Sequence, residues 1–550
     1  MAVVPGIQNA ARLEYRHRLR INFRSLYASP AGVFLESVLI GIVTGLIIVL
    51  FRLLLQRADL ARAAWYGFLR LAPWPVLALW LVALVPIGLF LGWTVQRWPM
   101  IAGSGIPQIR GALLRRLVLT WWPELPMKIL ASLVGLGCGL SLGREGPSIQ
   151  IGAYAGKGVL SVLGRPVVER KILISAGAAA GLSAAFNAPL AGVLFALEEL
   201  HKYFSGRLIA CAMGASLAAY MVASRFFGLE SVFNFSAIGA LGLEYLPAVV
   251  GLGAVAALAG LVFKQAYYKA QALYTALPLP AVARPILPLL LSVPVAFWLF
   301  DLTGGGHQLI ERLSTADFSG GVLLGLLALK IAFSALSYGS GTAGGVFLPL
   351  LAGGALLGKF WGVSLAALGW LEPGLELNFM ILGMAAFFTA VVKAPITGAI
   401  LILEMSGNLS HFSGLVACCL AAFVGSDLLR SSSIYEVFLE RLLRKPPAAA
   451  AVTPGSDGAP DQSTGQSTSS AAGSRPAGGR KLLLEIPVGL GSRLAHRCIR
   501  AIDWPAECLV VGIERGETEL LPRGGTELEP GDRLLVLAAA EQAVLPHNKI

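Results

Sequence analysis

Long apolar stretches recur along most of this chain, and glycine or proline interrupts many of them. They run from about Phe34 to about Leu429, and many have the length that a tilted helix needs to cross a bilayer. In lipid, broken helices are tolerated only where protein or a wet cavity surrounds them. The pattern therefore predicts an all-α polytopic membrane protein with broken, tilted helices, which is typical of a transporter or channel. The predicted spans include Val38 to Leu55, Val76 to Trp93, Leu246 to Phe263, Ile286 to Phe300 and Phe379 to Leu403.

The composition supports a membrane protein and argues against a nucleic-acid partner. Only 13% of the 550 residues are charged and 56% are hydrophobic, whereas soluble domains carry about a quarter of charged residues. The net charge of +12 is interpreted as the positive-inside bias of membrane proteins, and no aromatic-interleaved basic motif accompanies it. A basic amphipathic stretch from Ala10 to Arg24 takes the place of a signal peptide and predicts a cytoplasmic N-terminus.

Composition divides the chain into three predicted regions. Residues 1–445 form the membrane body, and 446–480 are a flexible linker rich in Pro, Ala, Gly and Ser. Residues 481–550 form a small α/β unit. Its predicted strands are Leu482 to Val488, Cys508 to Ile513 and Arg533 to Leu537, and its predicted amphipathic helix is Ser492 to Ile502.

The membrane body contains an internal repeat. Ala188–Glu198 matches Ala394–Glu404 at an offset of 206 residues (394 − 188), and Gly152–Lys157 matches Gly354–Lys359 at an offset of 202 (354 − 152). Duplicated transporter folds place their substrate at the repeat interface, where half-helix N-termini meet near the middle of the membrane. Sequence similarity alone leaves open whether the repeats are parallel or inverted.

A carboxylate stands inside apolar sequence at Glu145, in the pentapeptide Gly143–Pro147. A carboxylate is costly at membrane depth, so this one is a functional-site hypothesis by default. Pro147 suits the first turn of a helix, whose unpaired N–H groups favour anions. The pentapeptide predicts an anion site with a titratable carboxylate built into it.

Three motifs of this kind follow one another: Gly103–Pro107, Gly143–Pro147 and Gly345–Pro349. Each has a glycine-bearing turn before an expected helix, where free amides and the helix dipole carry partial positive charge. Several amides and hydroxyls can bind an anion and still release it. Together the three motifs predict one anion site built by several helix N-termini.

With these motifs in place, the sequence resembles the CLC family of chloride channels and chloride/proton exchangers over essentially all of residues 30–445. Two further segments, Phe186–Gly192 and Lys393–Gly398, look like hallmarks of that family. The resemblance implies two inverted repeats and a homodimer with one anion pathway per subunit. It also implies a multi-pass protein of a prokaryotic inner membrane with both termini cytoplasmic.

The resemblance also implies an anion-binding set. The Ser104 hydroxyl is expected to contact the central anion, where a serine goes with chloride preference and a proline with nitrate preference. The Tyr435 phenol completes the site from the inner side. The whole expected set is Ser104, Gly105, Ile106, Arg144, Gly146, Val346, Phe347 and Tyr435.

Two glutamates carry the expected proton chemistry. Glu145 corresponds to the gating glutamate, whose carboxylate competes with anions for the outer site until it is protonated. Glu199 matches the inner proton-transfer glutamate of many exchangers. The alternative places Glu198 and Glu199 at an acidic helix end, paired with His201 or Lys202.

Other polar residues stay without an assigned transport role. Lys128 fits structural pairing or weak anion attraction, and the role of Glu404 is open. His307 is interpreted as a satisfied polar group, and Glu198 as a member of the acidic helix end or a water-facing relay.

The tail departs from the family pattern of paired CBS modules. Segments such as Leu484–Pro487, Leu509–Arg515 and Leu528–Leu537 resemble the TrkA-C (RCK-C) regulatory module of potassium-uptake systems. The resemblance implies a small unit that dimerises and binds a small regulator. Ligand sensing and a role in assembly alone both stay open.

These observations favour a chloride/proton antiporter gated by Glu145, an ion transporter rather than an enzyme, with chloride and protons as substrates and no cofactor. The main alternative is a passive voltage- or pH-gated chloride channel, against which Glu199 argues. A fluoride-selective transporter fits Ser104 and Tyr435 less well, and a sensor that acts mainly through its tail is the alternative from another class.

Overall fold

The computed structural model describes residues 30–444, apart from 164–166, 234, 236–237, 240 and 373, and residues 481–539, apart from 489–493, 505–507 and 516–517. The chain divides into two compact units, Met1–Ala450 and Ala451–Ile550. The basic N-terminal stretch and the predicted linker lie outside the described residues. The boundaries of the three predicted regions stay predictions.

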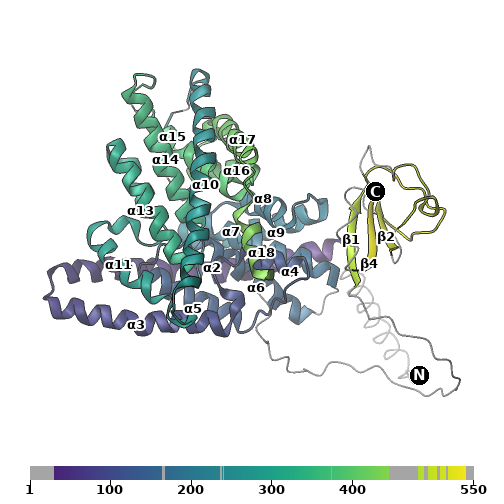
Figure 1. Cartoon of the computed structure of the whole chain (residues 1–550), viewed down its shortest axis with the longest axis horizontal. Coiled ribbons are helices and arrows are strands. Elements are labelled where there is room, and N and C mark those ends of the chain that lie inside the picture. Colours follow the sequence, from purple (N-terminus) through teal and green to yellow (C-terminus); the bar gives the residue numbers. More distant parts are fainter. Residues whose placement is uncertain are drawn as a thin grey trace, which may run out of the picture. The chain divides into compact units, whose positions relative to one another are not determined.

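The first unit, called the membrane unit, is a bundle of helices of unequal length. In Figure 1, α10, α13, α14 and α15 rise together, while α2 and α3 run across the base of the view. The helices of the first half are α2 Pro30–Leu71, α3 Trp74–Arg97, α4 Ile106–Leu113, α5 Glu124–Gly137, α6 Glu145–Leu163, α7 Val167–Phe186, α8 Pro189–Phe195 and α9 Gly206–Phe227. Those of the second half are α10 Leu246–Ala276, α11 Ile286–Trp298, α12 His307–Thr315, α13 Gly320–Gly339, α14 Phe347–Ala367, α15 Glu376–Val392, α16 Pro395–Ser406, α17 Phe412–Leu428 and α18 Ile434–Arg444.

Short turns of tighter or wider helix connect these elements. The π-helical turn η2 continues α8 over Ala196–His201. The 3₁₀ turns are η1 Pro99–Ile101, η3 Leu243–Tyr245, η4 Ala281–Ala283, η5 Phe300–Leu302, η6 Leu409–His411 and, in the second unit, η7 Ile499–Ala501.

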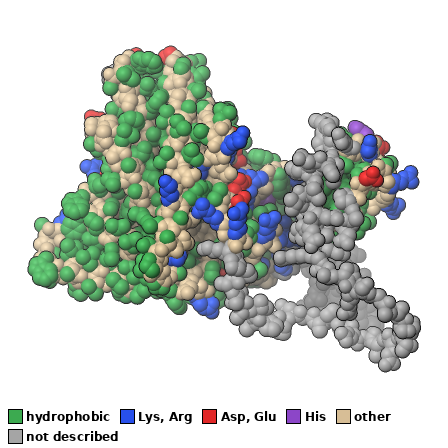
Figure 2. All heavy atoms as spheres, in the orientation of Figure 1, with side chains coloured by type: hydrophobic (Ala, Val, Ile, Leu, Met, Phe, Trp, Pro, Cys, Tyr) green, Lys and Arg blue, Asp and Glu red, His purple; other side chains and the backbone are tan. Residues whose placement is uncertain are grey.

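Within the described part of the chain, eight helices are long and apolar enough to cross a membrane: α2, α3, α9, α10, α11, α13, α14 and α17. Hydrophobic side chains cover most of the visible face of this unit, and charged side chains gather at one side of it (Figure 2). Four of the five predicted spans coincide with α2, α3, α10 and α11. The fifth, Phe379 to Leu403, is wrong as one helix because it breaks between α15 and α16.

The break in the second half has a counterpart in the first. Lys393 separates α15 from α16 at φ 64°, and Asn187 separates α7 from α8 at φ 54°, 206 residues earlier (393 − 187). A proline opens the following helix in both cases, as expected at the first helical position. The repeat found in the sequence is therefore a repeat of backbone geometry.

Glycines let equivalent helix pairs touch through their backbones. A methyl group built on Gly152 of α6 would lie 2.1 Å from the Gly177 carbonyl oxygen of α7, and one on Gly358 of α14 would lie 2.0 Å from the Phe379 carbonyl oxygen of α15. No side chain fits at either contact. Small residues at helix interfaces are the usual means of close packing in membranes.

The second unit is a four-stranded antiparallel sheet in the order β1-β4-β2-β3. The strands are β1 Lys481–Pro487, β2 Leu509–Arg515, β3 Thr518–Leu520 and β4 Arg533–Ala539, so the three predicted strands are confirmed and β3 is additional. The buried core residues are Val488, Leu494, Ile513, Leu528, Leu534 and Val536.

The predicted helix Ser492–Ile502 is wrong over its described residues, which form a turn and the 3₁₀ turn η7. Their backbone N–H groups bond to a distant segment instead of to the preceding helical turn. His496 donates to Leu528, and Ile499 donates to Thr526. The apolar spacing arises because this segment packs on the sheet as an irregular loop.

Candidate anion and proton site

All three glycine-proline motifs lie where helices begin. α4 follows Gly105, which has φ 82°, α6 begins at Glu145, and α14 begins at Phe347. The first N–H groups of a helix have no partner within it, so each start offers amides to an anion. α18, which carries Tyr435, begins one residue before that tyrosine.

Backbone hydrogen bonds join the three motifs to one another. Gly143 and Gly345 form an antiparallel bridge in which each N–H donates to the other's carbonyl at 2.7 Å. The Gly344 N–H donates to the Gly103 carbonyl at 3.0 Å. A methyl group on Gly146 would lie 2.9 Å from the Ser104 Cβ, so the first two motifs also touch. The fold thus gathers motifs about 240 residues apart, from Gly103 to Gly345, at one place.

Side chains hold the loop that precedes α4. The buried Lys128 ammonium donates to the carbonyl oxygens of residues 101 and 103 at 2.8 and 2.7 Å. Gln108 and Gln150 each donate to a further carbonyl of the same loop at 2.7 Å. Of the two interpretations of Lys128, the contacts therefore support structural pairing. These donors satisfy the loop carbonyls. The polar groups that remain beside the loop are the Ser104 hydroxyl, the helix amides and the Tyr338 hydroxyl, which would lie 2.8 Å from a methyl group built on Gly103.

Several buried polar atoms at the motifs have no hydrogen-bond partner among the described residues. They are the Ser104 hydroxyl, the Tyr435 hydroxyl and both carboxylate oxygens of Glu145. The three side chains are at most 1% exposed. Buried polar groups without partners are rare, because each costs about 1–3 kcal/mol. Two hydroxyl donors of this kind fit an anion as their partner.

The Glu145 carboxylate lies at the start of α14. A methyl group built on Gly143 would lie 2.5 Å from Glu145 Oε2 and 3.0 Å from the Leu348 backbone nitrogen, so both atoms share one small space. The Arg144 Nε atom is 3.6 Å from Glu145 Oε1. The carboxylate therefore occupies the surroundings of a helix amide that an anion would also occupy.

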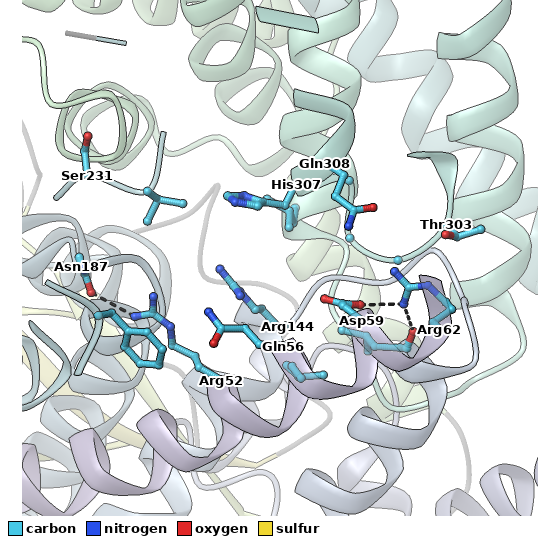
Figure 3. Close-up of a pocket in the computed structure, with 18 of the residues that line it drawn as sticks. Arg52, Gln56, Asp59, Arg62, Arg144, Asn187, Ser231, Thr303, His307 and Gln308 are labelled. Atoms are coloured by element: carbon cyan, nitrogen blue, oxygen red, sulfur yellow. Dashed lines mark hydrogen bonds and ion pairs between the residues drawn. The ribbon is translucent and has the colours of Figure 1, made fainter. Parts of the chain in front are cut away.

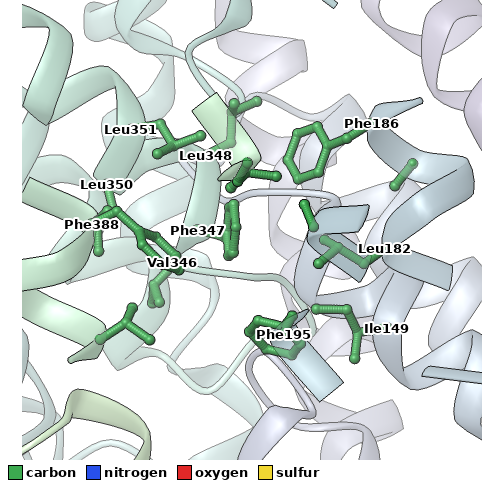
Figure 4. Close-up of a cluster of buried hydrophobic side chains, with 14 of the residues drawn as sticks. Ile149, Leu182, Phe186, Phe195, Val346, Phe347, Leu348, Leu350, Leu351 and Phe388 are labelled. Atoms are coloured by element: carbon green, nitrogen blue, oxygen red, sulfur yellow. The ribbon is translucent and has the colours of Figure 1, made fainter. Parts of the chain in front are cut away.

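The side chains of Val346 and Phe347 are buried and apolar, so neither can donate a hydrogen bond to an anion. The Phe347 ring packs against Phe186 and Phe388, with ring centroids 5.5 and 4.9 Å apart, inside a cluster of buried apolar side chains (Figure 4). At these two predicted positions only the backbone amide is available for an anion.

Glu199 lies in η2, fully buried, inside a cluster of charges. Its Oε1 is 3.6 Å from Arg110 Nη1, and its Oε2 is 3.1 Å from Lys202 Nζ. Glu436 contacts the same two cations at 3.1 and 3.8 Å, and its side chain is 38% exposed. Glu199 is thus paired with Lys202, as the alternative interpretation expected. The same cations also bind Glu436, a carboxylate that is partly exposed at the surface. Tyr435 lies within electrostatic range of both Glu145 and Glu199.

Sequence reasoning missed Arg110 and Glu436. They lie 326 residues apart, on α4 and α18, and meet at 3.1 Å. The available signal was their position: Arg110 is one turn into the helix that follows Ser104, and Glu436 is next to Tyr435.

Glu198 of the first repeat caps a helix in the second repeat, and Glu404 of the second repeat caps a helix in the first. Glu198 accepts hydrogen bonds from the backbone N–H groups of Ile396 and Thr397 at the start of α16. Glu404 of α16 accepts them from Leu190 and Ala191 at the start of α8. The expected pairing of Glu198 with His201 or Lys202 is wrong, since the carboxylate binds a helix N-terminus, and Glu404 gains the same role.

Two cavities flank the site. The Arg144 cavity, about 300 Å³, is lined by Arg52, Arg62, Arg144, His307 and other residues and includes Leu348 beside Glu145 (Figure 3). The Arg441 cavity, about 450 Å³, is lined by Gly103 beside Ser104 and by Tyr338, Arg284 and Arg441, among others. Glu145 therefore has one cavity on its own side, and Ser104 has the other. His307 contacts Glu311 at 3.2 Å through Nε2.

Comparisons with known proteins agree with this geometry. Residues 87–427 match the family model described as voltage gated chloride channel, and residues 483–543 match the TrkA-C domain. The H(+)/Cl(-) exchange transporter ClcA of Vibrio parahaemolyticus serotype O3:K6 is 34% identical over 443 residues, which is 77% of this chain and 92% of the relative. The protein of the same name from Vibrio cholerae serotype O1 is 36% identical over 448 residues, with the same coverage.

Solved structures are also similar. A slow cyanobacterial Cl⁻/H⁺ antiporter superposes with a TM-score of 0.72 at 27% identity, over 75% of this chain and 98% of that one. A eukaryotic CLC transporter superposes with a TM-score of 0.63 at 22% identity, over 75% of this chain and 74% of that one, which indicates the fold alone.

Proposed function

Because the chain belongs to the voltage-gated chloride channel (CLC) family, we propose that it is a secondary active antiporter that exchanges chloride for protons across a membrane. The predicted fold class, a polytopic CLC fold followed by a small separate module, is confirmed by the structural likeness and by the TrkA-C match. The relatives and the antiporter structure carry names of exchangers rather than enzymes or passive channels.

Chloride would bind where Ser104, Tyr435 and the helix amides meet. The two hydroxyls can donate hydrogen bonds, and the starts of α4, α6 and α14 add amides, with Gly105, Ile106, Gly146, Val346 and Phe347 among the contributing backbone positions. Arg144 adds a positive charge beside Glu145. No lysine or arginine ammonium or guanidinium is needed at the central position, so the anion can leave as well as bind.

Glu145 would act as the gate. As a carboxylate it competes for the helix amides at the start of α14, and protonation removes the charge on which that competition depends. The path for chloride then opens between the two cavities. One residue would thus couple proton uptake to anion movement.

Glu199 would supply the proton from the side of the partly exposed Glu436. The observation that carries this proposal is the charge cluster, because it joins the fully buried Glu199 to the partly exposed Glu436 through Arg110 and Lys202. A proton can reach Glu199 from water through Lys202, whose side chain is 33% exposed, while Arg110 stays protonated and only pairs with the carboxylates. The proton would then continue toward Glu145 past Tyr435.

The test is proton-coupled chloride flux in liposomes that contain the full chain. A chloride gradient should drive protons uphill, and a proton gradient should drive chloride. Chloride movement that never moves protons against their gradient would overturn the exchanger proposal and favour the channel alternative.

We also propose a homodimer in a bacterial inner membrane, with both termini in the cytoplasm. The support is the family and its bacterial relatives. Chemical cross-linking in native membranes and protease accessibility of the tail check these two expectations.

The TrkA-C module would regulate transport by binding a small ligand or would only assist assembly. Deletion of residues 446–550 separates these roles. Transport that stops responding to added nucleotides after the deletion supports sensing, whereas loss of the dimer with unchanged transport supports assembly.

A further inference from the structure

The loop that holds Ser104 occurs a second time in the other half of the membrane unit. Lys330 of α13 donates to the carbonyl oxygens of residues 302 and 304 at 3.0 and 3.2 Å, as Lys128 of α5 does at residues 101 and 103. The two lysines lie 202 residues apart (330 − 128), which matches the repeat. Helices α5 and α13 are therefore equivalent, and a residue of one can be compared with its counterpart in the other.

The two helices differ in the side chain that they bring to a loop at their C-terminal ends. Tyr338 of α13 contacts the first loop, since its hydroxyl would lie 2.8 Å from a methyl group built on Gly103. Its counterpart on α5 is Leu136, 202 residues earlier (338 − 136), which lines the Arg144 cavity together with Gly304 of the second loop. Of these two matching positions, only the one beside Ser104 carries a hydroxyl.

The Tyr338 hydroxyl lies beside Ser104 and at the wall of the Arg441 cavity. It is within interaction range of both the backbone and the side chain of Ser104. Tyr338 also lines the Arg441 cavity together with Gly103 and Pro107. The Ser104 hydroxyl has no hydrogen-bond partner among the described residues, so the two hydroxyls are neighbours that are not bonded to each other. Both can therefore donate to a third group that lies next to them.

Aromatic packing fixes the orientation of the Tyr338 ring. The ring stacks on Phe438 of α18, with centroids 5.1 Å apart and an interplanar angle of 21°, and it contacts Tyr267 of α10 at 5.6 Å. Phe438 lies one turn after Tyr435, whose hydroxyl is within electrostatic range of Tyr338. A donor that is held in place before binding loses little conformational entropy when the anion arrives.

We propose that Tyr338 contributes a third hydroxyl to the anion site of Ser104 and Tyr435, and that this hydroxyl raises the preference of the site for chloride over larger halides. The inference rests on the proposed anion transport. The three hydroxyls come from three separate elements: the loop before α4, the end of α13 and the start of α18. A hydrogen bond stabilises a small anion more than a large one, because electrostatic attraction falls with distance. The hydroxyl adds no positive charge, so the anion can still leave.

Tyr338→Phe removes the hydroxyl and keeps the ring that packs on Phe438 and Tyr267. The dissociation constant for chloride, measured by calorimetry on the full chain in detergent, should rise about tenfold, the factor expected for the loss of a hydrogen bond to a charged group. The dissociation constant for iodide should rise by a smaller factor, so the preference for chloride falls. Unchanged chloride binding, or equal losses for the two halides, would overturn the proposal.

Tyr274→Phe is the matched control. Tyr274 of α10 is also buried, and its hydroxyl has no hydrogen-bond partner among the described residues. Its ring would lie 3.1 Å from a methyl group built on Gly339, the residue after Tyr338. The control should keep its affinity for both halides. A loss as large as that of Tyr338→Phe would show that these tyrosines act through helix packing and not through contact with the anion.

Bromide soaked into crystals of the full chain locates the anion directly. Anomalous density within hydrogen-bonding reach of both the Ser104 and Tyr338 hydroxyls supports the proposal, and density that contacts Ser104 and Tyr435 but not Tyr338 contradicts it. Chloride binding at equilibrium does not depend on proton coupling, so the test is equally valid for a passive channel. Wild-type protein that binds no chloride would overturn the proposed transport as well, whereas normal wild-type binding without a loss in Tyr338→Phe overturns the third hydroxyl alone.

Discussion

Glu145 and Phe347 occupy matching places in the two halves of the membrane unit, 202 residues apart (347 − 145), on turns that are bonded to each other through Gly143 and Gly345. One side chain is a carboxylate beside a helix amide, and the other is a ring in an apolar cluster. The inner position differs in the same way, since Glu199 corresponds to the buried Met405, 206 residues later (405 − 199). The backbone for an anion is therefore built twice, whereas the two buried glutamates of the proposed proton path, Glu145 and Glu199, each have an apolar residue at the matching place in the second half.

The largest effect is expected from removing the gate. Glu145→Gln should lower proton flux by about 100-fold, the scale of losing a positioned acid–base group, while chloride flux continues. The amide stays uncharged at every pH, as the protonated acid does. Paired proton and chloride flux in liposomes measures this. The matched variant Phe347→Leu in the second half should keep coupling, and loss of coupling there would end the distinction between the halves.

Glu199→Gln is the next test of the comparison. Proton flux should fall by at least about tenfold because the buried end of the charge cluster no longer titrates, and chloride flux should remain. Met405→Leu, the matched change in the second half, should leave both fluxes intact. A Glu199→Gln protein with full coupling would refute its role.

Substitution of the two loop lysines, Lys128 and Lys330, distinguishes an effect on protein stability from an effect on chloride binding. Lys128→Met and Lys330→Met each leave two buried carbonyls without their donor, so each should destabilise the protein by about 1–3 kcal/mol. Only Lys128→Met should also weaken binding of chloride beside Ser104. Thermal unfolding in detergent and chloride titration by calorimetry measure the two effects. Equal loss of central chloride binding in both variants would show that the loops act globally.

Removal of either helix cap, the Glu198 carboxylate at α16 or the Glu404 carboxylate at α8, should lower stability by a similar amount. Glu198→Ala and Glu404→Ala each remove a carboxylate from a helix start and should each cost about 1 kcal/mol. Proton coupling should persist in both, in contrast to Glu199→Gln one residue away. Unfolding midpoints and coupled flux check this, and a loss of coupling in Glu198→Ala would return Glu198 to the proton path.

The sequence predicts the parts of this comparison that depend on local pattern. Glycine-proline motifs mark the starts of α4, α6 and α14, and the repeat marks the paired breaks at Asn187 and Lys393. It misses partners from distant segments, such as Arg110 with Glu436 and Glu198 with α16, because nothing in a local spacing says which helix start a carboxylate will meet. The roles of the predicted site residues stay predictions until flux and binding are measured.

The C-terminal unit has no counterpart in either half, and the smallest effect on transport is expected there. The buried Asp532 carboxylate accepts hydrogen bonds from Arg515 Nε and Nη2 at 2.9 and 2.8 Å and from the Glu529 N–H at 2.8 Å. The Arg515 guanidinium holds the pKa of Asp532 below its ordinary value of 3.8. The native state therefore binds this proton less readily than the unfolded chain, so the stabilisation is complete above about pH 4 and is lost as the pH falls through the lowered pKa.

Hydrogen exchange of β2 and β4 in the full chain should accordingly stay constant from about pH 7 to pH 5, after correction for the intrinsic rate, and accelerate below about pH 4. Asp532→Asn should accelerate it at all of these pH values, because Arg515 loses its charged partner at a buried position, at a cost of about 1–3 kcal/mol. Glu529→Gln, at the exposed partner of the same arginine, is the matched control and should have a much smaller effect. Chloride and proton fluxes at neutral pH should be the same in both variants. A flux change in Asp532→Asn alone would show that the stability of the TrkA-C module affects transport by the membrane unit. The module would then have to be included in the comparison between the two halves.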